Sequence, residues 1–185
     1  MSYNIPDYDT DKFSFGPGIL YMGVEGTTPL VDVGAVKEDG AEFSVERKSI
    51  QVKQGSPKSL IAEYVNEEEV KVKITGIEWN LDNLAYILGA GTTGGIGGVT
   101  ETFEFGGSMT KNKRALRFVH RMPDGSTIDI HVFKAQGSGK IVIPFKGDDM
   151  HEFPFEFAAL EGVTNFEGGA LAAGKKLFKI IRTKA

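Results

Sequence analysis

The stretch NLDNLAYILGAGTTGGIGG, residues 80–98, decides what kind of fold this chain can adopt. Its glycines match the G-x-G-x-x-G spacing of a dinucleotide-binding loop, in which a strand enters the glycines and a helix leaves them. Here the order is reversed, because leucines recur at helical spacing before Gly89. We therefore predict a short helix over about residues 80–89, with Asn80 or Asp82 as its N-cap and Gly89 as its C-cap.

The reversed order argues against nucleotide binding. A helix C-terminus carries partial negative charge, which repels phosphate, so the glycines are interpreted as a C-cap followed by a mobile loop. The residues TETFEF that come next are typical of a strand. The predicted helix has an apolar face, and we expect four side chains to anchor it in the core: Trp79, Leu81, Leu84 and Leu88.

Outside this helix, apolar and polar residues alternate with a period of two, the pattern of half-buried antiparallel strands. The alternation is clearest over 69–75, 127–132, 141–145 and 152–157. Further strand candidates are 18–24, 41–45, 49–53, 60–65, 100–105, 115–121 and 177–182, while 168–174 fits either a helical turn or a loop. Turn-forming residues cluster at 38–40, 55–57, 123–125, 137–139 and 147–149. The pattern predicts a mainly β chain, an antiparallel sandwich or barrel-like fold with one short flanking helix.

One segment, ERKSIQVKQGSPKS at residues 46–59, is poorly explained by the core of a single subunit. The apolar phase set by Phe43 and Val45 slips by one residue before Ile50 and Val52, where charge also rises. A β-bulge or a long projecting hairpin accounts for the slip, and an isolated two-stranded hairpin is only marginally stable in water. We predict that residues 46–59 form a polar hairpin, mobile in the monomer, that packs on another subunit. The residues expected to make this contact are Arg47, Lys48, Lys53, Gln54 and Lys58.

The composition excludes several classes of function. The 185 residues carry a net charge of −4, so the chain lacks the excess of Lys and Arg that general nucleic-acid binding needs. There is no cysteine, which excludes disulfides and cysteine-based metal or catalytic sites. The first residues are unlike a signal peptide and no apolar run could span a membrane, so we expect a cytoplasm-like compartment. The length predicts one domain over residues 1–185, with a flexible segment at 1–14.

No group of residues indicates catalysis or a cofactor. His120, His131 and His151 lie on separate predicted strands and lack the close second ligand of a zinc motif. The carboxylate run at 67–69 is typical of a solvated turn, and there is no G-x-S-x-G nucleophile elbow. We expect no catalytic residue, no metal site and no cofactor.

Three short segments of the sequence are similar to segments of a known protein family. They are VGAV at 33–36, EFSV at 42–45 and IEWNLDNLAYILG at 77–89. Together with the predicted order of elements over roughly residues 15–160, they resemble the major tail tube proteins of long-tailed bacteriophages, whose fold also occurs in the inner tubes of contractile tails and type VI secretion systems. The segments that carry the resemblance lie in the first half of the chain.

The resemblance implies a virion structural protein. Six copies would close into a ring, and rings would stack into a hollow tail tube through which double-stranded DNA passes without specific binding. The implied partners are further copies of the chain, the tape measure protein and the tail terminator and tip proteins. The implied location is the virion tail, after assembly in the host cytoplasm.

Two other functions remain open at this point. The first is a non-catalytic β-sandwich module that binds a carbohydrate or a protein, and the second is a nucleotide-dependent enzyme that uses the glycine loop. A binding module would display a cluster of exposed aromatic residues or a metal loop. Trp79 instead lies at a strand-to-helix junction, where burial is the usual outcome.

Overall fold

The computed structural model describes residues 18–78, 80–107, 112–138, 142, 147 and 151–185, with residues 38–40 described by their backbone alone. This part of the chain forms ten strands and one helix, and every strand pair is antiparallel. In chain order the elements are β1 (Gly18–Gly23), β2 (Val31–Asp32), β3 (Val36–Gln54), β4 (Ser59–Gly76), α1 (Leu81–Leu88), β5 (Thr92–Gly94), β6 (Thr102–Glu104), β7 (Lys113–Arg121), β8 (Thr127–Ser138), β9 (Phe153–Ala159) and β10 (Phe178–Thr183). The prediction of a mainly β fold with one short helix is confirmed.

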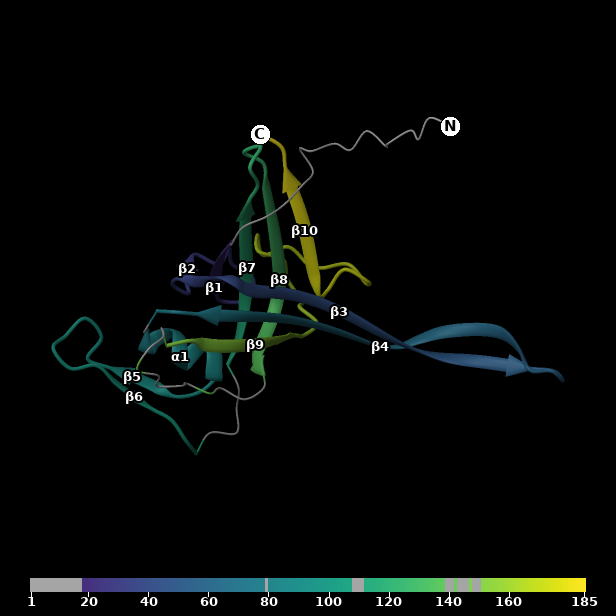
Figure 1. Ribbon diagram of the computed structural model, residues 1–185, viewed down its shortest axis with the longest axis horizontal. Helices are drawn as coiled ribbons and strands as arrows, with labels where there is room; N and C mark the ends of the chain where they lie inside the picture. The colour runs from purple at the N-terminus through teal and green to yellow at the C-terminus, as the bar shows by residue number, and fades with distance from the viewer. Residues whose placement is uncertain (1–17, 79, 108–111, 139–141, 143–146, 148–150) are drawn as a thin grey trace.

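The main sheet has the strand order β2-β1-β7-β8-β9-β4-β3, with β10 also paired to β8. Strand β8 divides one of its edges between two partners. Its first half pairs with β10 up to Val132, and its second half pairs with β9 from Ala135 onward. In Figure 1, β7, β8 and β10 run upright while β3, β4 and β9 cross them, so the sheet folds over itself into two layers.

The core fills the space between these two layers. The alternation predicted for 69–75 and 152–157 is confirmed, because Val70, Val72 and Ile74 on β4 are buried and so are the phenylalanines of β9. They pack with residues of β1, β7, β8 and α1 in one cluster, whose buried members are Leu20, Met22, Val33, Val72, Ile74, Ile87, Leu116, Val132, Ala135, Phe153, Phe155 and Phe157. Burial of each large side chain contributes about 1.5–3 kcal/mol, so this cluster is the main source of stability.

The helix begins and ends where its capping residues predict. The Asn80 side chain accepts a hydrogen bond from the backbone N–H of Asn83, and Gly89 closes the helix in the left-handed conformation with φ 66°. Leu84 and Ile87 are buried, whereas Leu81 and Leu88 are half-buried. Trp79, the fourth expected anchor, lies outside the described residues.

Two helix positions that the leucine spacing did not single out carry much of the packing. Ile87 is 3% exposed, and Asn83 is also 3% exposed and donates its side-chain amide to the carbonyl of Val33. A buried amide that lost this partner would destabilise the fold by about 1–3 kcal/mol. The helix is therefore held by a polar contact to the β2–β3 connection as well as by apolar packing.

Several local predictions differ from the structure. The candidates at 41–45 and 49–53 belong to one strand of 19 residues, β3, and those at 60–65 and 69–75 to one strand of 18 residues, β4. Residues 38–40, predicted as a turn, continue β3 at a register shift. The expected loop after the helix contains a small hairpin, β5–β6, and residues 168–174 form turns without a helix. The strand predicted at 141–145 lies almost wholly outside the described residues.

Candidate functional site

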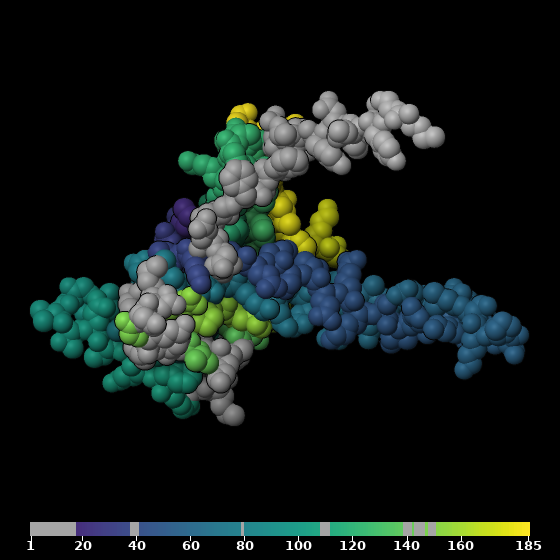
Figure 2. Space-filling view, in the orientation of Figure 1, coloured from purple at the N-terminus to yellow at the C-terminus, as the bar shows by residue number. Residues whose placement is uncertain are grey.

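A two-stranded arm is the most prominent feature of the surface. Strands β3 and β4 pair almost to their connecting turn, and Figures 1 and 2 show the ribbon extending far beyond the two-layered body. Strand β9 pairs with β4 only from Lys71 to Gly76, so within the described chain the ribbon has no third strand beyond Lys71. We call residues 45–70 the arm.

The pairing of β3 with β4 is irregular at two places in the arm. The β3–β4 register shifts between Lys48 and Ser49 and again between Val52 and Lys53. At each shift β4 contributes one extra residue, because Lys48 pairs with Glu67 while Ser49 pairs with Val65. The expected bulge is therefore present within the projecting hairpin, and its extra residues lie on β4, where the sequence pattern had not placed them.

Charged pairs hold the middle of the arm together. Arg47 Nη2 lies 2.6 Å from Glu68 Oε1, and Lys48 Nζ lies 3.2 Å from Glu67 Oε1, each pair being opposite in the strand register. The hydrogen bond to Glu67 raises the pKa of Lys48 above its usual value. The carboxylate run predicted as a solvated turn is thus part of β4. Two of the five residues expected to reach a neighbouring subunit already have carboxylate partners within their own arm.

The remaining three expected contact residues lie at the end of the arm. Lys53, Gln54 and Lys58 are all exposed. In the described part of the chain, neither lysine lies within ion-pair distance of a carboxylate. The predicted contact residues therefore fall into two groups. Arg47 and Lys48 pair with carboxylates of the arm itself, whereas Lys53 and Lys58 at its end have no carboxylate partner among the described residues.

The arm is not the polar hairpin that the sequence analysis predicted. Seven large apolar side chains on it are at least 44% exposed: Val45, Ile50, Val52, Leu60, Ile61, Tyr64 and Val65. We call these the arm stripe. The sequence analysis predicted the hairpin over residues 46–59 alone and assigned 60–65 to a separate strand, whereas the ribbon includes all of these residues and leaves both of its faces in solvent. Exposed apolar residues grouped in this way indicate a contact surface.

A second hairpin projects from the opposite end of the molecule. Strands β5 and β6 form a separate two-stranded sheet, which Figures 1 and 2 place at the far end from the arm. Its base is fastened to the helix, because Thr93 Oγ1 donates a hydrogen bond to Asp82 Oδ1 at 2.7 Å. Phe103 lies against Gly91, where φ is 106° and a Cβ would come within 2.6 Å of the ring. We call residues 91–107 the end hairpin.

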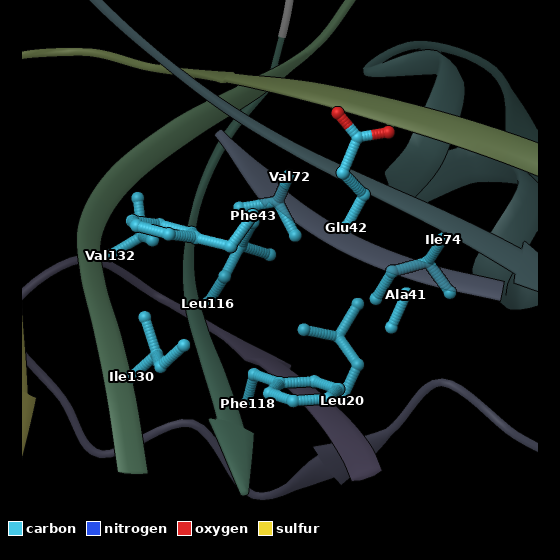
Figure 3. Close-up of a pocket in the computed structure, with 10 residues that line it drawn as sticks. All are labelled: Leu20, Ala41, Glu42, Phe43, Val72, Ile74, Leu116, Phe118, Ile130 and Val132. Atoms are coloured by element: carbon cyan, nitrogen blue, oxygen red, sulfur yellow. The ribbon is translucent and has the colours of Figure 1, made fainter. Parts of the chain in front are cut away.

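An apolar cavity lies between the two layers of the body. The cavity, of about 170 Å³, is lined by Leu20, Ala41, Glu42, Phe43, Val72, Ile74, Leu116, Phe118, Ile130 and Val132. The carboxylate of Glu42 points away from the apolar side chains in Figure 3 and lies 3.6 Å from Lys73 Nζ. A lining of this kind offers no set of polar groups to orient a sugar or a nucleotide.

Comparison with known families decides the class of this protein. The family model described as phage tail tube protein matches residues 23–170, which is most of the chain. The chain belongs to the phage tail tube protein family. No curated protein matches it.

The matched region of this tail tube protein includes the whole arm, the helix and the end hairpin. Membership of the family gives the protein a structural role in the tail tube of a virion. It also implies self-association into a tube, together with partners in the phage tail. The resemblance drawn from the three sequence phrases is therefore confirmed at the level of the family.

The described residues of this tail tube protein hold no group of three or more potential metal ligands. His120 is buried on β7, and the ring of His131 stacks on Phe166 with 4.3 Å between their centroids. Nor is any helix in the described ranges long and apolar enough to cross a membrane.

Proposed function

We propose that copies of this chain close into hexameric rings, and that the rings stack into the hollow tail tube through which DNA is delivered to the host. The proposal rests on the family and on the arm. An arm with seven exposed large apolar side chains and, in the described part of the chain, no third strand is only marginally stable in water unless it packs on something else. In a homo-oligomer the available surface is another copy of the chain.

The charge of the chain supports a conduit rather than a DNA-binding protein. A net charge of −4 disfavours general attraction to phosphate, and each ring that attracted DNA would slow its passage. DNA would then move through the tube without specific binding. In this proposal the protein is not an enzyme and uses no cofactor.

The finer partners follow from the same proposal. A tube of defined length needs a protein that measures it and proteins that close its two ends, and the tape measure, tail terminator and tip proteins fill these roles. Assembly would take place in the host cytoplasm, and the finished protein would reside in the virion tail. The chain acts as a single tail tube domain over residues 1–185.

Electron microscopy of the purified protein at increasing concentration tests the proposal. We expect rings at low concentration and stacked tubes at higher concentration, with six-fold symmetry in averaged end views. The contact residues and helix anchors expected from the sequence remain proposals that mutagenesis can address. A protein that stays monomeric at millimolar concentration, with a normal thermal transition, would contradict the proposal and favour the binding-module alternative.

A further inference from the structure

The arm and the end hairpin have complementary compositions. Residues 50–62 of the arm contain two lysines, Lys53 and Lys58, and no Asp or Glu. Residues 91–107 of the end hairpin contain two carboxylates, Glu101 and Glu104, and no Lys or Arg. The distal arm, residues 50–62, is therefore cationic, and the end hairpin is anionic.

The apolar surfaces of the two hairpins match as well. The distal arm exposes Ile50, Val52, Leu60 and Ile61 from the arm stripe. The end hairpin exposes Ile96, Val99 and Phe105, of which Val99 is wholly exposed. The two groups cannot pack against each other within one chain, because the two hairpins lie at opposite ends of the molecule (Figure 2). A pairing between them removes apolar surface from water on both sides.

Glu101 and Glu104 of the end hairpin are both exposed. The backbone N–H of Gly97 donates to Glu101 Oε1 at 2.9 Å, which fixes this carboxylate over the loop and leaves its second oxygen available. Glu104 is exposed and is within ion-pair distance of no cation among the described residues. The rings of Phe103 and Phe105 stack with their centroids 6.4 Å apart, which stiffens the strand that carries Glu104.

From these observations we infer that the distal arm of one copy docks on the end hairpin of the next copy. Lys53 and Lys58 pair with Glu101 and Glu104, and the exposed apolar residues of the two hairpins pack beside these ion pairs. The inference rests on the proposed self-assembly and specifies its contact. Because a contact between opposite ends is heterologous, it propagates from copy to copy and does not close into a dimer.

Charge reversal tests this pairing. K53E/K58E and E101K/E104K are each expected to raise the protein concentration at which tubes form by at least tenfold. The combination of all four substitutions is expected to return that concentration to within about threefold of the wild-type value. The matched controls K179E/K184E and E161K/E167K change the net charge equally at exposed positions and should leave tube formation unchanged.

Disulfide crosslinking gives a second measurement. Because the chain contains no native cysteine, only the introduced thiols can form disulfides. In the L60C/V99C variant the two thiols are at opposite ends of one chain, so oxidation can join only different copies. We expect a ladder of covalent oligomers on a non-reducing gel, and no ladder from the control L60C/K179C.

The outcomes distinguish this inference from the proposed function. Wild-type tubes combined with no ladder and no rescue by the fourfold variant would show that the end hairpin is not the receptor for the arm. A wild-type protein that forms no rings or tubes would overturn the proposed function itself. Circular dichroism of each variant confirms that a lost assembly does not reflect a lost fold.

Discussion

The guanidinium of Arg117 on β7 donates hydrogen bonds from Nη2 and Nε to the carboxylate of Asp129 on β8. Its oxygen Oδ2 lies 2.6 Å from Nη2 and 2.9 Å from Nε. His131 Nε2 lies 3.0 Å from the other oxygen of Asp129. Burial of the Asp129 carboxyl raises its pKa, but the hydrogen bonds from Arg117 and the proximity of His131 outweigh that effect and lower the pKa below its usual value. The cluster therefore makes the stability of the fold depend on pH.

Acid should destabilise the protein through Asp129. The pKa of this carboxyl is about 3.9 in the unfolded chain and lower in the folded chain. Its contribution to stability is therefore complete above about pH 4 and is lost as the pH falls through the lower, folded-state pKa. We expect Asp129→Asn to cost about 1–3 kcal/mol at pH 7 and to make the loss of stability below pH 4 less steep. Denaturant melts at several pH values measure both effects.

Asp124 provides the comparison for this experiment. Hydrogen bonds from Ser126 lower the pKa of its exposed carboxyl, so part of the acid sensitivity should persist in the Asp129 variant. Equal acid profiles for the wild type and Asp129→Asn would show that the cluster does not control stability.

The helix should depend on Leu84. This side chain is 7% exposed, and its truncation to alanine leaves a cavity beside the sheet. We expect Leu84→Ala to lower the free energy of unfolding by about 2–5 kcal/mol and to reduce the soluble yield. Leu81→Ala, at a half-buried position on the same helix, is the matched control and should cost less. A change below about 1 kcal/mol for Leu84→Ala in a denaturant melt would contradict the packing described for this helix.

The glycine loop after the helix should bind no nucleotide. Gly89 is a left-handed C-cap, so the residues at this position face the negative end of the helix. Thermal-shift titration with millimolar NAD or ATP should leave the melting temperature unchanged. A ligand present at 100 times its dissociation constant would add about 2.7 kcal/mol of stability, an effect that this measurement would detect.

Removal of the arm should separate folding from assembly. Arg47 and Glu68 are opposite each other in the register, so an Asn-Gly turn can join them and replace residues 48–67. The deleted ribbon lacks a third strand in the described chain, so the thermal transition should remain close to that of the wild type. Tube growth should fail in electron micrographs. Long tubes from the shortened protein at the usual concentration would show that the arm is dispensable for stacking.

The sequence was sufficient where the structural signal is local. The caps at Asn80 and Gly89 and the alternation on β4 and β9 depend on neighbouring residues, and the structure confirms them. The orientation of the short helix could not be predicted as well, because its packing buries Asn83 and Ile87 in preference to Leu81 and Leu88. An eight-residue helix offers too few turns to define one face by leucine spacing alone.

The projecting hairpin was predicted, but the chemistry of its surface was not. A phase slip between Val45 and Ile50 located the arm, because it places apolar side chains on both faces of the continuous strand β3, unlike a strand that packs on a core through one face. The exposed apolar stripe was missed, because an apolar residue in a strand has the same sequence signature whether it faces a core or a partner subunit. The pairing of Arg47 with Glu68 was missed because cross-strand neighbours depend on a register that bulges alter.

The length of the arm also has a mechanical consequence. The ten residues from Val45 to Gln54, at about 3.3 Å each, span roughly 30 Å, and the ribbon ends in its turn beyond them. A ribbon two strands thick is compliant across its face but resists stretching along its strands, where the backbone is already extended. Subunits tethered by such ribbons can tilt relative to one another while the distance between them stays fixed. A filament joined in this way bends under a sideways load without coming apart.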